Sequence, residues 1–547
     1  DKPVVKLSNG TLLEMLGILA ETADSENDYV LELDQFLLND IAGSATLSPE
    51  KLNDQTDFKI TLVAKKGDSD VSGQTSTIAS VNLLTYGGAA NDANDGSLFV
   101  INGGISLEVG DGVSLHGINN GTAATGQKEP LVSVGAAGTF IMSEGSTITL
   151  VKNIASADVP NVNIGGAVRV NSGGEFIMEG GTITGVEVKA GQNGSGAGVY
   201  VKGESARFTM KDGKITANKE LTSYGRGAGV YINGTGAGEG KECLFTMTGG
   251  EITENEGGDS CDGLGVYIRG ASVDSRTVFS MSGGLIARQV STTSLGGGVY
   301  VDRYSKFELS GTGQIASNQN GGVFIECYSI FEMTGGEISN NTSIGFGGGV
   351  LLSSAEKAEF TMTGGEITGN TAVYTSQSRG GGVYIGIKSV FNMKAAPEGG
   401  TDPVISGNTA ELGGGVYVAA LGTSYGTFNM EGGIIKKNQA VEKQGSSNSA
   451  RGGGVYVAGE TTPSGLCGLV NKTGGVIAGS SSGSDANTVS NTNGNTKAGQ
   501  AAFLALLNSD IASGNYYVND TSAADDVNFN VNGYNSRGSD WKNCGGS

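Results

Sequence analysis

The sequence predicts an all-β fold, a right-handed parallel β-helix solenoid with three strands per coil and a short N-terminal capping helix. Two repeated phrases carry this prediction. Gly-Gly-Gly-Val-Tyr-Val alternates with Phe-x-Met-x-Gly-Gly-x-Ile-x-x-Asn from about residue 140 to residue 480. A repeat of this size indicates a solenoid in which each coil contacts only its neighbours. The phenylalanine of the second phrase returns after 24 to 37 residues, at positions 140, 176, 208, 245, 279, 307, 331, 360, 391 and 428.

Glycine content and charge limit the class of protein. The chain has 547 residues, with 95 glycines and a formal net charge of -21. The glycines do not fall at every third position, which excludes collagen, and they stand before β-branched and aromatic triplets as turns stand before strands. The negative charge argues against nucleic acid and other polyanions as partners. No apolar run is long enough for a transmembrane helix.

The N-terminal segment, residues 1–96, is predicted to form a cap with irregular first coils. Thr11 followed by Glu14 is a capping-box signature, and the helix is expected over residues 9–21. An open solenoid end exposes its core and strand edges, so a helix that covers it stabilises the fold. The apolar face of this helix is expected at Leu12, Leu13, Leu16 and Leu19. Strand-like runs follow at Tyr29–Leu33, Phe58–Val63 and Ser80–Leu84.

Each coil of the β-helix, predicted over residues 97–510, combines three short strands. The residue between Phe and Met is polar from Thr209 onward, so Phe and Met are expected to face inward. Val-Tyr-Val supplies a second strand, and the Ile after Gly-x supplies the third. Residues 511–547 are expected to form the C-terminal cap and tail. The asparagine that closes the third strand is expected to form an inward ladder of amides, at Asn218, Asn255, Asn318, Asn341, Asn370, Asn408 and Asn438.

The repeat phrases resemble those of bacterial cell-surface β-helix proteins. The resemblance is to the polymorphic outer-membrane protein and adhesin-like groups of the pectin-lyase-like superfamily, and it covers residues 97–510. It implies a right-handed parallel β-helix on the bacterial outer surface or outside the cell. It implies no single activity, because that superfamily holds adhesins, lyases and hydrolases.

A row of aromatic residues is the first candidate binding site. If the two valines of Val-Tyr-Val face inward, the middle residue points outward once in each coil. An outward aromatic row on a rigid face could stack on sugar rings or dock a protein, while stacked aromatics also suit neighbouring strands without any ligand. The row consists of Tyr200, Tyr231, Tyr267, Tyr300, Phe324, Leu351, Tyr384, Tyr417 and Tyr456.

Asp302 and Glu326 are the second candidate site. They follow the aromatic positions of adjacent coils, about 5 Å apart at the backbone, with Arg269 one coil away. Such a pair could serve a retaining glycosidase or hold Ca²⁺. It equally suits a solvated ladder in which Arg269 neutralises Asp302. We predict no cofactor and no metal site, with Ca²⁺ at this pair or at the loop Asn91–Gly96 as the alternative.

The histidine and the cysteines do not indicate a catalytic or metal-binding site. His116 is the only histidine and is expected in a turn, which argues against a Ser-His-Asp triad or a His-metal site. Cys243 and Cys261 flank one coil and either form a bridge or remain free thiols among the five cysteines.

The sequence therefore favours a non-enzymatic, adhesin-like protein, secreted or on the cell surface, that binds glycan or host protein along the aromatic row. One alternative is a polysaccharide-degrading hydrolase or lyase that uses Asp302 and Glu326. The negative charge disfavours acidic sugars, so a neutral-glycan hydrolase is the better form of this alternative. The other alternative is a structural stalk, in which the aromatic row only packs.

Overall fold

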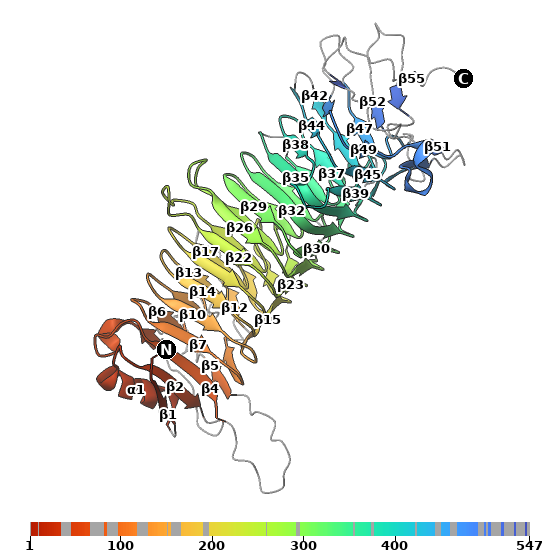
Figure 1. Cartoon of the computed structure of the whole chain (residues 1–547). Coiled ribbons are helices and arrows are strands. Elements are labelled where there is room, and N and C mark those ends of the chain that lie inside the picture. Colours follow the sequence, from red (N-terminus) through yellow and green to blue (C-terminus); the bar gives the residue numbers. More distant parts are fainter. Residues whose placement is uncertain are drawn as a thin grey trace, which may run out of the picture. The chain divides into compact units, whose positions relative to one another are not determined.

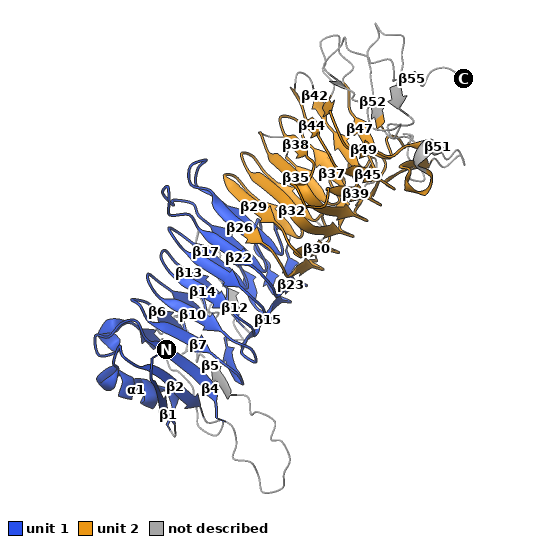
Figure 2. Cartoon of the chain, in the orientation of Figure 1, with its two compact units in different colours: residues 1–279 blue, residues 280–547 orange. Residues whose placement is uncertain are grey.

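Both parts of the chain are parallel β-helices, which confirms the fold class predicted from the sequence (Figure 1). The chain divides into two compact units, residues 1–279 and 280–547 (Figure 2). The computed structural model describes residues 2–8, 10–33, 45–65, 81–84, 97–117, 129–149, 151–154, 166–189, 196–258, 260–290, 296–353, 356–373, 377–421, 424–442, 450–459 and 468–490, and the strands at 497–498, 502–504, 516–518, 530–531 and 542–543.

Three parallel sheets surround the core of unit 1. The tyrosine sheet carries the Val-Tyr-Val strands: β3 (Ala45–Leu47), β6 (Phe99–Ile101), β9 (Val132–Val134), β13 (Val168–Val170), β17 (Val199–Lys202), β21 (Val230–Asn233) and β25 (Val266–Arg269). The phenylalanine sheet begins with β1 (Val4–Leu7), β2 (Asp28–Leu33), β4 (Lys59–Ala64), β7 (Ser106–Val109), β10 (Thr139–Met142), β14 (Glu175–Met178), β18 (Arg207–Met210) and β22 (Leu244–Met247). It continues beyond the Gly-Gly turn with β5 (Val81–Leu84), β8 (Val113–His116), β11 (Thr147–Thr149), β15 (Thr182–Thr184), β19 (Lys214–Thr216) and β23 (Glu251–Thr253). The short sheet, which the sequence did not predict, holds β12 (Lys152–Ile154), β16 (Glu187–Lys189), β20 (Lys219–Glu220) and β24 (Glu256–Gly257). Strand β26 (Thr277–Met281) contains the division between the units.

Unit 2 repeats this arrangement. Its tyrosine sheet holds β28 (Val299–Val301), β31 (Val323–Ile325), β34 (Val350–Leu352), β37 (Val383–Ile385), β41 (Val416–Val418), β47 (Val455–Val457) and β52 (Ala502–Leu504). Its phenylalanine sheet holds β27 (Leu285–Ala287), β29 (Ser305–Leu309), β30 (Gln314–Ala316), β32 (Ile330–Ser339), β35 (Glu359–Thr368), β38 (Val390–Met393), β39 (Val404–Ser406), β44 (Thr427–Met430), β45 (Ile434–Lys436), β48 (Leu469–Lys472) and β49 (Val476–Ile477). Its short sheet holds β33 (Thr342–Ile344), β36 (Thr371–Val373), β40 (Thr409–Ala410), β46 (Gln439–Val441) and β50 (Thr488–Ser490). In β32 and β35 the Phe-x-Met and Ile strands join into one bent strand, so each of these coils has three strands.

Inward phenylalanine and methionine side chains build the core, as predicted. In β35, Phe360 and Met362 are buried while Thr361 between them is partly exposed. The phenylalanine rings stack from coil to coil; the Phe360 centroid lies 4.5 Å from that of Phe331 and 4.6 Å from that of Phe391. Offset stacking of this kind adds to the stability gained from burial alone.

The predicted asparagine ladder is present. All seven predicted asparagines are at most 1% exposed, and Asn487 adds a further rung. Asn341 is typical: its Nδ2 donates to Oδ1 of Asn370 at 2.9 Å and to the carbonyl oxygen of Ile315 at 2.9 Å. Because each amide both donates and accepts, a polar column is buried at little cost.

The triple-glycine turn needs glycine for two different reasons. Gly380 has φ +67°, in the left-handed region that side chains disfavour. At Gly382 the reason is space, because a Cβ there would lie 2.6 Å from the carbonyl oxygen of Gly415 in the next coil. The turns of successive coils therefore stack backbone on backbone.

The helix α1 (Leu12–Thr22) lies beside β1 and β2 at the N-terminal end of unit 1 (Figure 1). Its capping box is present, with Thr11 and Glu14 bonded reciprocally. The predicted apolar face is wrong in one respect: Leu13 is 49% exposed, and Met15 is buried with Leu12 and Leu19 instead. Those three positions share one face at the helical period, whereas Leu13 is rotated away from it.

Antiparallel strands end the sheets of unit 2. β54 (Asn530–Val531) pairs antiparallel with β48, β51 (Lys497–Ala498) with β50, and β53 (Tyr516–Val518) with β52. β55 (Lys542–Asn543) then pairs with β53. Pairing in this direction occupies the edges that the parallel coils leave open. The remaining elements are the hairpin β42–β43 (Ala420–Leu421 and Ser424–Tyr425) and the short helices η1 (Pro49–Lys51) and η2 (Ser480–Asp485).

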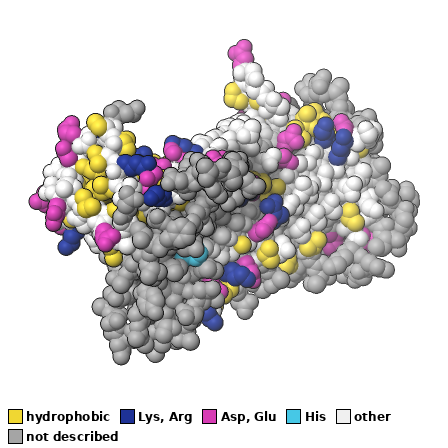
Figure 3. Space-filling view, turned by 90° about the horizontal axis from the view of Figure 1, so that it is seen from below, with side chains coloured by type: hydrophobic (Ala, Val, Ile, Leu, Met, Phe, Trp, Pro, Cys, Tyr) yellow, Lys and Arg dark blue, Asp and Glu magenta, His cyan; other side chains and the backbone are white. Residues whose placement is uncertain are grey.

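The surface is polar and mixed in charge. On the face drawn in Figure 3, basic and acidic side chains are interspersed. Several charged side chains pair between neighbouring coils, as Lys211 does with Glu179 at 2.8 Å. No helix within the described residues is long and apolar enough to cross a membrane.

Candidate functional site

The aromatic row predicted from the sequence is buried, and this corrects the expectation of an accessible stripe. Each member lies at the middle of a tyrosine-sheet strand, between two inward residues, as expected. The exposure of the eight aromatic side chains nevertheless reaches only 9%, at Tyr384. Leu351 is partly buried. The buried members are Tyr200, Tyr231, Tyr267, Tyr300, Phe324, Tyr384, Tyr417 and Tyr456.

Among the described residues, arginines that stand just before a glycine turn cover part of this row. The guanidinium carbon of Arg379 lies 5.5 Å from the ring centroid of Tyr417, and Arg226 lies 5.6 Å from that of Tyr267. The turn itself also lies against the row, since a Cβ on Gly452 would be 2.9 Å from the Cβ of Tyr456. The rings also contact one another: Tyr384 and Tyr417 are stacked with centroids 5.2 Å apart, while Tyr231 meets Tyr267 edge to face. No ring face is therefore left open for a sugar, and burial raises the pKa of the Tyr417 hydroxyl.

Asp302 and Glu326 follow paired strands of unit 2, as predicted. Val301 and Ile325, which precede them, are register partners. Asp302 is 5% exposed, and its Oδ1 accepts the backbone N–H of Arg303 at 2.7 Å. Glu326 accepts hydrogen bonds from Cys327 Sγ at 3.2 Å and from Ser353 Oγ at 3.4 Å. These local bonds hold the two carboxylates against the chain, which favours a structural role.

Arg269 belongs to unit 1, where it ends β25 in register with Asn233 of β21. Lys202 of β17 is in register with Asn233 in turn, so polar residues follow the tyrosine positions of three successive coils in that unit.

His116 and the cysteines have structural environments. His116 ends strand β8 rather than lying in a turn, its Nε2 is 3.1 Å from Ser114 Oγ, and burial lowers its pKa. Cys243 and Cys261 are buried free thiols rather than a bridge. Burial raises the pKa of Cys243 to about 12, so this thiol is not a nucleophile at neutral pH. Cys467, Cys544 and the loop Asn91–Gly96 lie outside the described residues.

Tyr304 and Tyr328 form a stacked aromatic pair that sequence reasoning missed. They occupy the corner between the tyrosine and phenylalanine sheets, with left-handed φ values of 58° and 60°. Their centroids are 5.5 Å apart at an interplanar angle of 10°, and Tyr328 is 42% exposed. A bulky residue in this region of backbone space is uncommon. The stack covers one face of each ring, and Tyr328 is the more exposed of the two.

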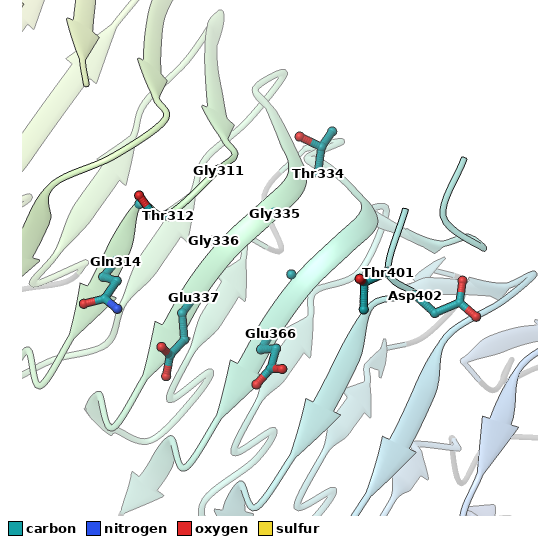
Figure 4. A pocket seen from close by; sticks show the side chains of 12 residues that line it. Gly311, Thr312, Gln314, Thr334, Gly335, Gly336, Glu337, Glu366, Thr401 and Asp402 are labelled. Atoms are coloured by element: carbon teal, nitrogen blue, oxygen red, sulfur yellow. The ribbon is translucent and has the colours of Figure 1, made fainter. Parts of the chain in front are cut away.

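A groove on the phenylalanine sheet of unit 2 is the better candidate site, and the sequence analysis missed it too. It has a volume of about 570 Å³, within the range of small-molecule sites. Glycines at the turns of successive coils, Gly335 and Gly336 in β32 and Gly365 in β35 among them, form its floor, and Thr334, Glu337 and Glu366 project beside them (Figure 4). We call it the glycine groove; it is lined by Gly311, Thr312, Gly313, Gln314, Thr334, Gly335, Gly336, Glu337, Gly365, Glu366, Thr401 and Asp402.

A row of polar side chains runs along this groove. Gln314, Glu337 and Glu366 are register partners on β30, β32 and β35, and Figure 4 shows them side by side on successive strands. Adjacent strands are about 4.8 Å apart, so the two carboxylates are close neighbours. Like charges directly opposite each other in a sheet are destabilising.

Glu337 and Glu366 differ from the other glutamates of their strands. Glu332 of β32 pairs with Lys306 at 2.9 Å, and Glu359 of β35 pairs with Lys357 at 3.1 Å. Among the described residues, no cation pairs with Glu337 or Glu366. Both side chains are at least partly exposed on the wall of the groove, so a bound ligand can reach these carboxylates and donate hydrogen bonds to them.

The part of the chain that the structure describes holds no group of three or more His, Cys, Asp or Glu side chains that could bind a metal ion. The groove thus offers carboxylate, amide and hydroxyl groups as hydrogen-bonding partners. Comparison of the chain with protein-family models, curated proteins and solved structures finds no match in any of the three.

Proposed function

We propose that the protein is a non-enzymatic, adhesin-like β-helix protein of the cell surface or the extracellular space, and that it binds neutral glycans in the glycine groove. The observation that carries this proposal is the row of Gln314, Glu337 and Glu366 in a groove floored by glycine. The cell-surface location rests on the resemblance of the repeat phrases to bacterial surface proteins.

The chemistry of the groove favours sugar over other ligands. Sugar hydroxyls donate to carboxylates and accept from amides and hydroxyls, which are the groups that Glu337, Gln314 and Thr334 present. Anionic sugars are disfavoured by the two unpaired carboxylates and by the net charge of -21.

A protein partner fits the groove less well. Protein interfaces depend on aromatic, methionine and arginine anchors in apolar surroundings. The lining residues of the groove are Gly, Thr, Gln, Glu and Asp, and none of these side chains supplies an apolar anchor of that size.

A neutral-glycan hydrolase is the second candidate. The backbones of Glu337 and Glu366 are about 4.8 Å apart on paired strands, and the two carboxyl groups of retaining glycosidases are about 5–5.5 Å apart. This pair replaces Asp302 and Glu326 as the candidate for catalysis, because it faces an open groove. Product analysis of any bound glycan separates the two functions.

The test begins with an array of neutral glycans and the intact protein, followed by calorimetry on the strongest hit. Glu337→Gln and Glu366→Gln are each expected to weaken binding by about tenfold to a hundredfold, the range for a hydrogen bond to a charged group. Glu332→Gln and Glu359→Gln are matched controls, since they make the same charge change in the same strands outside the groove. These controls should bind like wild type.

Three results would change the proposal. Binding of no neutral glycan overturns it. Equal weakening by the control variants means that only net charge acts, and also overturns it. Release of shorter sugars by the wild type, lost in Glu337→Gln, replaces it with the hydrolase.

A further inference from the structure

One coil of unit 2 interrupts the glycine floor. The register pairs Glu366 with Val404, so Asp402 and Pro403 stand where the preceding coil has Gly364 and Gly365. Ten residues, 394–403, occupy the turn between Met393 and Val404. The preceding coil spans the same turn with three, 363–365. The groove meets this longer turn, because Thr401 and Asp402 line it (Figure 4).

The insertion is anchored at both of its ends. Lys394 donates its backbone N–H to the carbonyl oxygen of Met362 at 2.9 Å. Pro403 is buried, and its carbonyl oxygen accepts from Ile434 N at 2.9 Å. The two ends thus join the ladders of the coils on either side.

The tip of the insertion is closed by its own hydrogen bonds. Oδ1 of Asp402 accepts the backbone N–H of Ala396 at 2.8 Å. Gly400 N donates to the carbonyl oxygen of Pro397 at 2.8 Å. A compact loop whose ends are held and whose tip bonds to itself keeps a defined shape.

The glycine floor resumes beyond the insertion without rejoining the groove. Gly432 and Gly433 form the next turn and do not line the groove; Gly432 stacks on the coil before it as other glycine turns do, with Ala395 N 2.2 Å from where its Cβ would lie. Thr401 and Asp402 of the insertion thus stand at the end of the groove lining, before the glycine turn of the next coil.

We propose that the loop Lys394–Pro403 closes the glycine groove at one end, so that the site takes the terminal segment of a neutral glycan chain rather than an internal one. This inference rests on the proposed glycan binding and adds the part of the chain that is recognised. A linear ligand that lies across β30, β32 and β35 must end at Thr401 and Asp402, and the opposite direction remains the exit for the rest of the chain.

The experiment measures how many protein molecules one polysaccharide chain binds. Size-fractionated neutral glucans and xylans of increasing length serve as probes, and saturation is measured by analytical ultracentrifugation. The wild-type protein is expected to saturate at a fixed number per chain at every length, because the number of chain ends does not change.

A loop-shortened variant supplies the matched comparison. In it, residues 394–403 are replaced by Thr-Gly-Gly, the turn found after Met362. This variant is expected to bind in proportion to chain length, with at least about tenfold more protein on the longest chains. Hydrogen exchange of the β38 and β39 amides checks that both strands remain paired.

Each outcome supports or overturns the closed end of the groove, the role of the loop or glycan binding itself. Wild-type saturation that grows with chain length overturns the closed end while leaving glycan binding intact. A fixed number per chain that persists in the folded loop-shortened variant shows that another feature selects the end, and overturns the role of the loop. If the variant does not fold, the wild-type stoichiometry alone still decides between ends and internal segments. Absence of binding to any probe overturns the proposed function itself.

Discussion

The side-chain oxygen of Asn408 accepts two hydrogen bonds from Asn370, one from its backbone N–H at 2.9 Å and one from its Nδ2 at 3.0 Å. A single buried amide thus fixes both the main chain and the side chain of the coil before it. Because Asn408 also donates to Asn438 Oδ1 at 2.9 Å, the same geometry passes from coil to coil.

Replacing Asn408 with Ala is expected to destabilise unit 2 by about 2–5 kcal/mol, since two buried donors of Asn370 lose their acceptor. The urea midpoint and the exchange rate of the Asn370 amide report the loss. Asn392→Ala is the control; Asn392 accepts from Asn429 in a similar ladder at 2.8 Å, but on the partly exposed outer face. A loss in Asn392→Ala as large as that in Asn408→Ala would contradict the importance of burial.

Two glycine substitutions should act in opposite directions. Gly382→Ala places a Cβ 2.6 Å from the carbonyl oxygen of Gly415, and overpacking of this kind costs about 1–3 kcal/mol. Gly17 lies in α1, where a Cβ added to it would meet no other atom within 4 Å, so Gly17→Ala should stabilise by about 0.5–1 kcal/mol. Thermal midpoints of both variants test the pair, and a stabilised Gly382→Ala would show that the turns are loosely packed.

Unit 1 should lose stability as the pH rises towards 8 because of Glu220. This side chain is fully buried; Oε1 accepts from Thr222 N at 3.0 Å, and Oε2 has no hydrogen-bond partner among the described residues. Burial raises the pKa of Glu220 to about 8, while an unfolded glutamate titrates near its usual value of about 4.3. Between these two values the folded state holds a proton that the unfolded state has released, so stability falls with rising pH and levels off above about 8.

The Glu220 prediction is checked by urea midpoints at several pH values. Glu220→Gln should remove a few kcal/mol of this pH dependence, while Glu239→Gln, at an exposed position, should leave it unchanged. If wild-type stability, compared with that of Glu220→Gln, rises instead of falling between pH 5 and pH 8, the raised pKa of Glu220 is rejected.

The aromatic row should behave as core in a mutational test. Tyr417 stacks between Tyr384 and Tyr456, at centroid distances of 5.2 and 5.1 Å, so Tyr417→Ala is expected to cost about 3–5 kcal/mol. Tyr417→Phe keeps the stack and should lose much less. Equal effects of the two changes on the unfolding midpoint would mean that the hydroxyl, rather than the ring, matters at this position.

The repeat phrases were enough to predict the sheets, the inward Phe and Met, and the asparagine ladder. Each of these follows from local alternation multiplied over many coils, as in the Phe360 stack. The burial of Tyr417 could not be predicted from local alternation, because it depends on the segment that carries Arg379, which packs over the ring from the preceding coil. The glycine groove could have been predicted from two features of the sequence. A turn with only glycine at its bend leaves space beside the strands, and residues 394–403 break the short Met-to-Ile spacing of the preceding coils.

That break has a consequence for how such a chain can change. With seven added residues, Met393 remains in register with Met430, and Ile405 with Ile435. The positions of these core residues therefore do not depend on the length of the turn between them. Variation can therefore accumulate at this bend without a compensating change elsewhere. The turns between the Phe-x-Met and Ile strands can thus accept loops of different length. Exchanging the loop at such a turn is a direct way to alter ligand selectivity while the β-helix stays unchanged.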